Sequence, residues 1–141
     1  MDAATKKTLL VKLKAVGRCL KEYNSYKQEV DAYDQTLVAQ DKKQADFYKE
    51  STEALEAVKK SLVDFVQGLE SFMIENKEEI EGEDDPNVVA ELNKGKENVE
   101  KAKLLFPADL WSGYIIIRYR QIYDINESEA KKLQFLCFLR T

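Results

Sequence analysis

Apolar side chains recur at alternating steps of three and four residues along three stretches of the chain. The first stretch comprises Leu9, Leu13, Val16, Leu20, Tyr23, Tyr26, Val30, Tyr33 and Leu37. The second comprises Tyr48, Leu55, Val58, Leu62, Phe65, Leu69 and Phe72, and the third comprises Leu92, Val99, Ala102 and Phe106. This spacing places one narrow apolar face on each of three helices. The pattern predicts an all-α, antiparallel three-helix bundle of the spectrin-like or coiled-coil-like kind over residues 1–106.

Capping signals mark where two of these helices begin. Asp85 followed by Pro86 is typical of a helix start, because the carboxylate accepts a bond from a free amide and proline suits the first helical position. Pro107 should end the same helix, which predicts a third helix over residues 86–106. The acidic stretch at 75–85 before it reads as a solvated helix end and linker.

The connection between the first two helices leaves two alternatives. The three-four spacing continues from Leu37 to Leu55 without a change of phase, so a single helix over residues 5–80, roughly 110 Å long, fits the pattern. However, residues 40–46 are almost entirely polar, and Asp41 with Gln44 resembles a capping box. We favour a turn there, with the third helix returning alongside the second. Gly17, Gly68 and Gly95 would then lie at one level of the bundle. Either they allow the helices to approach closely, or the long helices simply tolerate them.

Composition removes several functional classes. The chain has 141 residues, no histidine and a net charge of −4. Without histidine it lacks the commonest general base, and it shows no nucleophile, phosphate-loop or dinucleotide motif, so we expect no enzyme, cofactor or metal site. A net negative charge disfavours nonspecific nucleic-acid binding. No signal peptide or transmembrane stretch is evident, which favours a cytoplasmic protein.

The first helix resembles a known family. Residues 12–29, KLKAVGRCLKEYNSYKQE, match the family pattern at Lys12, Lys14, Ala15, Arg18, Lys21, Glu22, Tyr26 and Glu29. This run is similar to the first helix of tubulin-binding cofactor A, a three-helix chaperone of the tubulin-folding pathway. The resemblance implies a cytoplasmic, cytoskeleton-associated protein that holds β-tubulin released by the chaperonin and passes it toward αβ-tubulin assembly. The resemblance also allows other tubulin-folding cofactors as partners.

The resemblance suggests a partner-binding face on the outside of the first helix. The expected contact residues are Lys14, Arg18, Lys21, Glu22 and Tyr26. The alternative for each is a solvated helix face, on which Arg18 pairs with Glu22 one turn further along. For Tyr26 another alternative is a position in the core. The chain departs from the family by lacking a proline in its second helix, by carrying Gly17 before the arginine, and by continuing beyond residue 106.

Residues 107–141 differ in composition from the rest. They are rich in aromatic residues and include Trp111, the only tryptophan of the chain. Residues 114–117 (YIII) read as a strand and Asn126 could begin a short helix. This extension could be an interaction or dimerisation arm, or non-homologous sequence from an alternative transcript or a gene-model error.

Two other functions also fit the pattern. One is a homo-oligomeric coiled-coil scaffold or tether, in which the chain dimerises along one long helix. The other is a membrane-peripheral helical protein that places Arg118, Arg120, Lys131 and Lys132 near lipid headgroups. Our main prediction is a monomeric tubulin chaperone, with a homodimer as the alternative state.

Overall fold

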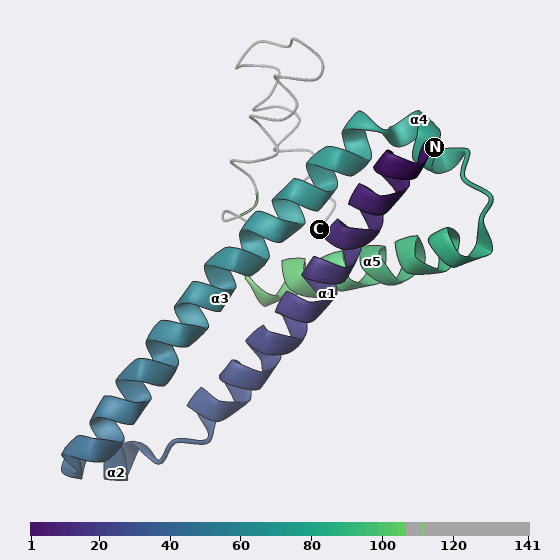
Figure 1. Cartoon of the computed structure of the whole chain (residues 1–141). Coiled ribbons are helices and arrows are strands. Elements are labelled where there is room, and N and C mark those ends of the chain that lie inside the picture. Colours follow the sequence, from purple (N-terminus) through teal and green to yellow (C-terminus); the bar gives the residue numbers. More distant parts are fainter. Residues whose placement is uncertain (107–110, 112–141) are drawn as a thin grey trace, which may run out of the picture. The chain divides into compact units, whose positions relative to one another are not determined.

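The computed structural model describes residues 1–106 and Trp111, and these residues are helical apart from short connections (Figure 1). The structure divides after Val99 into two units. The described part of the second unit comprises residues 100–106 and Trp111. The predicted all-α bundle is confirmed for these residues. The predicted strand at 114–117 and the helix after Asn126 lie outside them.

Helix α1 spans Ala3–Asp31. It begins at Asp2, whose Oδ1 accepts a hydrogen bond from the amide of Thr5 at 2.7 Å. It ends where the Ala32 amide donates to the carbonyl of Gln28 at 3.0 Å. Its buried residues are Leu9, Leu13, Val16, Cys19, Leu20, Tyr23 and Val30. The first apolar stripe is therefore the core face of α1 as far as Val30.

Two aspartates interrupt the chain between α1 and the next long helix. Helix α2 spans Gln35–Gln40 and α3 spans Lys42–Glu75. Asp34 accepts from the amide of Thr36 and Asp41 from the amide of Lys43, both at 2.9 Å, and both aspartates have extended backbones. The predicted helix start at Asp41 is confirmed, although Asp41 accepts from Lys43 and not from Gln44 as the capping box required, and the continuous helix over residues 5–80 does not form. The first helix also ends earlier than the stripe suggested, because Leu37 lies in α2 and is 50% exposed.

Helices α1 and α3 form an antiparallel hairpin (Figure 1). Three contacts join α3 to α1 or to the turn that follows it, and they fix the register. The Lys12 ammonium lies 5.9 Å from the centre of the Phe72 ring, the Cys19 thiol lies 3.6 Å from the Val58 carbonyl oxygen, and the Tyr33 hydroxyl lies 3.3 Å from the Ser51 hydroxyl. From α3 the core receives Leu62, Val66 and Leu69, all fully buried.

A small polar cluster stabilises the hairpin near its turn. Ser51 is buried, and its hydroxyl donates to Glu29 Oε1 at 3.2 Å while lying within hydrogen-bond distance of the Tyr33 hydroxyl. The Tyr33 ring packs edge-on against Tyr48 with 5.5 Å between ring centres. The buried serine therefore has partners for its hydroxyl, which removes the cost of burying it unpaired.

The acidic stretch after α3 is more ordered than predicted. It contains helix α4, Lys77–Glu81, whose Ile80 is buried. The Glu83 side chain is only 6% exposed and pairs with Lys6 at 3.5 Å, and Lys6 also lies 3.6 Å from Asp85. Most of this stretch is exposed, as predicted, but one apolar side chain and one ion-paired carboxylate tie the connection to the start of α1.

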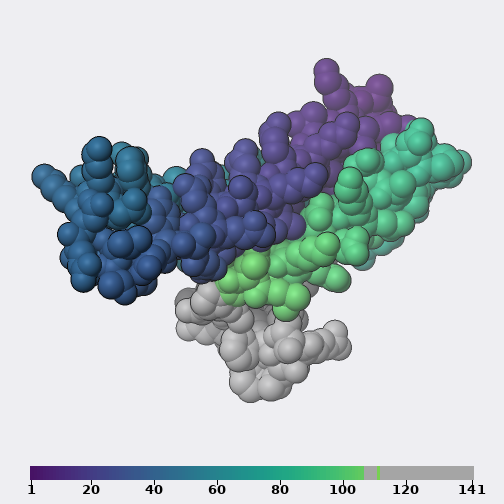
Figure 2. Space-filling view, turned by 90° about the horizontal axis from the view of Figure 1, so that it is seen from below, coloured from purple at the N-terminus to yellow at the C-terminus, as the bar shows by residue number. Residues whose placement is uncertain are grey.

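Helix α5 spans Pro86–Leu105, within one residue of the predicted end. The predicted cap is present, since the Asn87 amide donates to Asp85 Oδ1 at 3.0 Å. We expected this helix to return alongside the second helix. Instead, its close contacts at Gly95 and Asn98 are made with α1, which it crosses (Figures 1 and 2).

Glycines allow this crossing. A Cβ added at Gly95 would collide with the Leu13 side chain, and one at Gly17 would lie 3.1 Å from Asn98 Nδ2. A Cβ added at Gly68 would have Lys12 Nζ as its nearest neighbour at 4.0 Å, which is an ordinary contact distance. Close helix approach therefore explains Gly17 and Gly95, and tolerance explains Gly68.

Alanine substitutions at two of these glycines should have opposite effects. Gly95→Ala should lower the free energy of unfolding by up to about 2 kcal/mol, because an overpacking cost of about 1–3 kcal/mol is partly offset by a helix-propensity gain of about 1 kcal/mol. Gly68→Ala should raise it by about 0.5–1 kcal/mol, since only the propensity gain applies. Urea denaturation measures both. Equal effects of the two substitutions would argue against the α1–α5 contact.

Candidate partner-binding face

The five residues predicted to bind a partner lie on one strip of α1. Lys14, Arg18, Lys21 and Glu22 are exposed, and Tyr26 is half-buried. Steps of three and four residues keep these side chains on adjacent parts of the helix surface. The structure therefore brings all five together, with Tyr26 at the edge of the strip that lies nearest to the core.

The outward side of this strip is basic. Lys7, Lys14, Arg18 and Lys21 are exposed, and Val11, 60% exposed, lies among them. Within the described residues these four cations form no ion pair, whereas Lys6, Lys27 and Lys77 each do. Like charges one turn apart on a helix are destabilising by a few tenths of a kcal/mol. The charge of this strip is thus not neutralised by the described part of the molecule.

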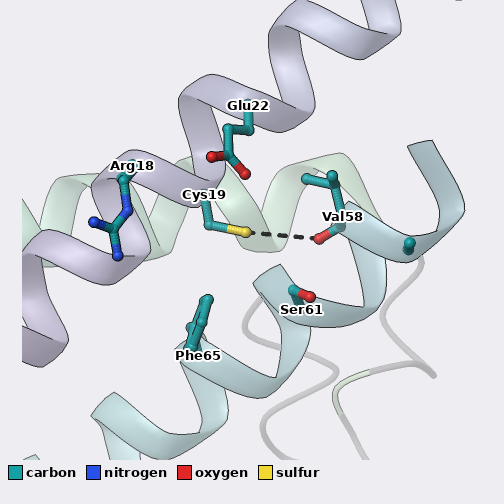
Figure 3. Close-up of a pocket in the computed structure, with 7 residues that line it drawn as sticks. Arg18, Cys19, Glu22, Val58, Ser61 and Phe65 are labelled. Atoms are coloured by element: carbon teal, nitrogen blue, oxygen red, sulfur yellow. Dashed lines mark hydrogen bonds between the residues drawn. The ribbon is translucent and has the colours of Figure 1, made fainter. Parts of the chain in front are cut away.

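Arg18 and Glu22 do not form the ion pair that the alternative of a solvated helix face suggested. Both instead line a cavity of about 280 Å³ between α1 and α3 (Figure 3). The remaining lining residues are Cys19 from α1 and Ala57, Val58, Ser61 and Phe65 from α3. The cavity therefore has an apolar floor and carries both signs of charge on its α1 side.

Cys19 forms part of the floor of this cavity. It is 4% exposed, and its thiol donates to the Val58 carbonyl. Burial raises the pKa of the Cys19 thiol, the nearby Glu22 carboxylate raises it further, and Arg18 partly opposes this shift. The thiol is therefore neutral at physiological pH, so it is a packing group and a weak donor here, not a nucleophile.

Phe65 is the residue of this site that the sequence did not indicate. The apolar stripe places it in the core, yet it is 44% exposed, while Val66 is fully buried. In Figure 3 its ring stands between the two helices beside the cavity. The signal was ambiguous, because Leu62, Phe65, Leu69 and Leu62, Val66, Leu69 both follow three-four spacing.

Comparisons with known proteins identify no relative of this chain. No protein-family model matches the chain, and neither the curated proteins nor the solved structures include a significant match. Among the described residues, no helix is long and apolar enough to cross a bilayer.

Proposed function

We propose that this protein is a non-enzymatic binding protein of the tubulin-folding pathway, which holds β-tubulin and passes it toward αβ-tubulin assembly. The observation that carries the proposal is the strip of exposed cations on α1, which includes Lys14, Arg18 and Lys21 and has no ion-pair partner within residues 1–106. These three cations are among the five residues suggested by the family resemblance. On this proposal the protein acts in the cytoplasm beside the cytoskeleton.

The strip suits a transient contact. Its charges are solvated, so their attraction for an acidic partner surface accelerates association but is weakened by salt. The α1·α3 hairpin gives the strip a rigid support, because the core face of α1 is packed against fully buried residues such as Leu62 and Leu69. A preorganised charged helix loses little conformational entropy on binding. Such a surface can capture a folding intermediate and release it without nucleotide.

Capture of purified β-tubulin tests this function directly. We expect the full-length chain to co-elute with β-tubulin in size-exclusion chromatography at low salt, and the complex to weaken as salt is raised to about 0.5 M, where the Debye length is well below 8 Å. Light scattering of the chain alone should give the monomer mass of 16.3 kDa. Absence of any complex would contradict the proposal, and a stable homo-oligomer would favour the scaffold alternative.

A further inference from the structure

The cavity and the contacts with α5 lie on different flanks of the α1·α3 hairpin. Helix α5 contacts α1 on the flank that contains Leu13 and Gly17. Cys19 follows Gly17 by two residues, which corresponds to about 160° around an α-helix, so the cavity lies on nearly the opposite flank. On this flank the groove between α1 and α3 holds Phe65, whose ring is 44% exposed.

The size and lining of the cavity indicate what kind of group it receives. Its volume of about 280 Å³ corresponds to the lower end of the sizes typical of small-molecule sites, roughly 300–1,000 Å³. Ala57, Val58 and Phe65 offer apolar surface, and the Cys19 thiol already donates a hydrogen bond to the Val58 carbonyl. An apolar side chain of another protein suits such a cavity better than an independent polar ligand or cofactor does.

The charges beside the cavity indicate which kind of protein segment would carry this apolar side chain. Arg18 and Glu22 lie one helical turn apart, line the same cavity and do not pair with each other. A segment that presents a carboxylate and a cation one turn apart, with an apolar side chain between them, complements both residues and fills the cavity. This spacing is produced by an α-helix.

A helix also matches the shape of the site. Two antiparallel helices leave a groove between their side-chain ridges into which a third helix can pack. On α3 the lining runs from Ala57 to Phe65, which at 1.5 Å per residue is about 12 Å, or roughly two helical turns. Small side chains at Cys19, Ala57 and Ser61 let another backbone approach closely.

We propose that the groove beside Phe65 binds an amphipathic helix of the captured protein, with Phe65 as its main apolar contact and Arg18 and Glu22 as its charged contacts. This inference rests on the proposed function and specifies how the client is held. Aromatic residues that become desolvated at the centre of an interface, surrounded by weaker contacts, commonly carry much of the binding energy. The basic strip then steers the client, and the groove retains it.

Substitution of Phe65 tests this arrangement against a matched aromatic residue. Phe65→Ala should weaken β-tubulin binding about ten- to thirtyfold, mainly through faster dissociation. Phe47→Ala is the control, because Phe47 is 50% exposed on the same helix but does not line the cavity. It should change the dissociation constant by less than about twofold. Equal effects of the two variants would overturn the inference.

Photo-crosslinking provides a second measurement that does not depend on an alanine variant. A photoreactive phenylalanine analogue at position 65 should crosslink to a helical, amphipathic segment of β-tubulin, and the same analogue at position 47 should not. Capture of β-tubulin without a crosslink from position 65, or with a crosslink to a non-helical segment, would overturn the groove proposal and leave the proposed function intact. Failure of the unsubstituted chain to capture β-tubulin would instead refute the proposed function, and this inference with it.

Discussion

Leu62→Ala should lower the free energy of unfolding by about 2–5 kcal/mol, the largest stability effect that we expect from a single substitution in this chain. The Leu62 side chain is fully buried in α3, on the face that packs against α1. Its truncation removes apolar contacts and leaves a cavity that long, well-packed helices can only partly fill. The hairpin depends on this layer because α1 and α3 bury few other large side chains completely.

Urea denaturation followed by circular dichroism measures this effect. Leu37→Ala is the matched control, since it removes the same atoms from a side chain that is 50% exposed in α2. It should cost less than about 1 kcal/mol. Similar losses at the two leucines would mean that Leu62 is not buried and that the register between α1 and α3 is wrong.

Helix boundaries set by a capping side chain were predictable from the sequence. Asp41 and Asp85 each cap a helix start where the local sequence indicated one, and each accepts a bond from the amide two residues further on. The break at Asp34 was not predicted. The three-four spacing continues through residues 32–41, so the apolar pattern alone gave no sign that α1 ends at Asp31. The carboxylate cap and the extended backbone of Asp34 decide the break locally.

The inner and outer residues of α3 were harder to distinguish. Phe65 and Val66 both continue the spacing from Leu62 to Leu69, and the predicted stripe contained Phe65. The structure buries Val66 and leaves Phe65 beside the cavity. Burial here depends on how α3 is rotated against α1, a property of the packed pair that no single helix sequence contains. The residue that the pattern misplaced is the one with the most accessible aromatic surface at the candidate site.

The crossing of α5 over α1 also depends on packing between helices. The sequence placed Gly17 and Gly95 in helices but did not indicate which helices would meet there. The structure shows that Gly95 faces Leu13 and Gly17 faces Asn98. Likewise, the acidic stretch at 75–85 appeared solvated because its charges dominate the local composition. The burial of Ile80 and the pairing of Glu83 with Lys6 arise only when this stretch reaches the first turns of α1.

The candidate binding strip was the part of the site that sequence could place. Lys14, Arg18 and Lys21 share one face of any helix, whatever that helix packs against, because their spacing follows the helical repeat. Their exposure agrees with this expectation. The cavity was not predictable, since it requires Arg18 and Glu22 of α1 to face Phe65 of α3.

Reversing two charges of this strip should strongly weaken β-tubulin capture while sparing the fold. In the Arg18→Glu, Lys21→Glu double variant, association should slow about tenfold or more at low salt, because the attraction that steers the encounter becomes repulsion. Both side chains are exposed and have no ion-pair partner within residues 1–106, so the melting temperature and helicity should change little.

Lys94→Glu, Lys96→Glu is the matched control, since it makes the same change in net charge at two exposed positions of α5. Stopped-flow association measured between about 0.05 and 0.5 M salt separates a local effect from a general one, because screening removes long-range steering in every variant. If the strip on α1 is the contact surface, only the Arg18, Lys21 variant loses rapid capture at low salt, and the difference between the two variants shrinks as salt rises. If both variants slow capture equally, net charge alone steers the encounter and α1 has no special part in it. If neither does, the binding face lies elsewhere on the chain.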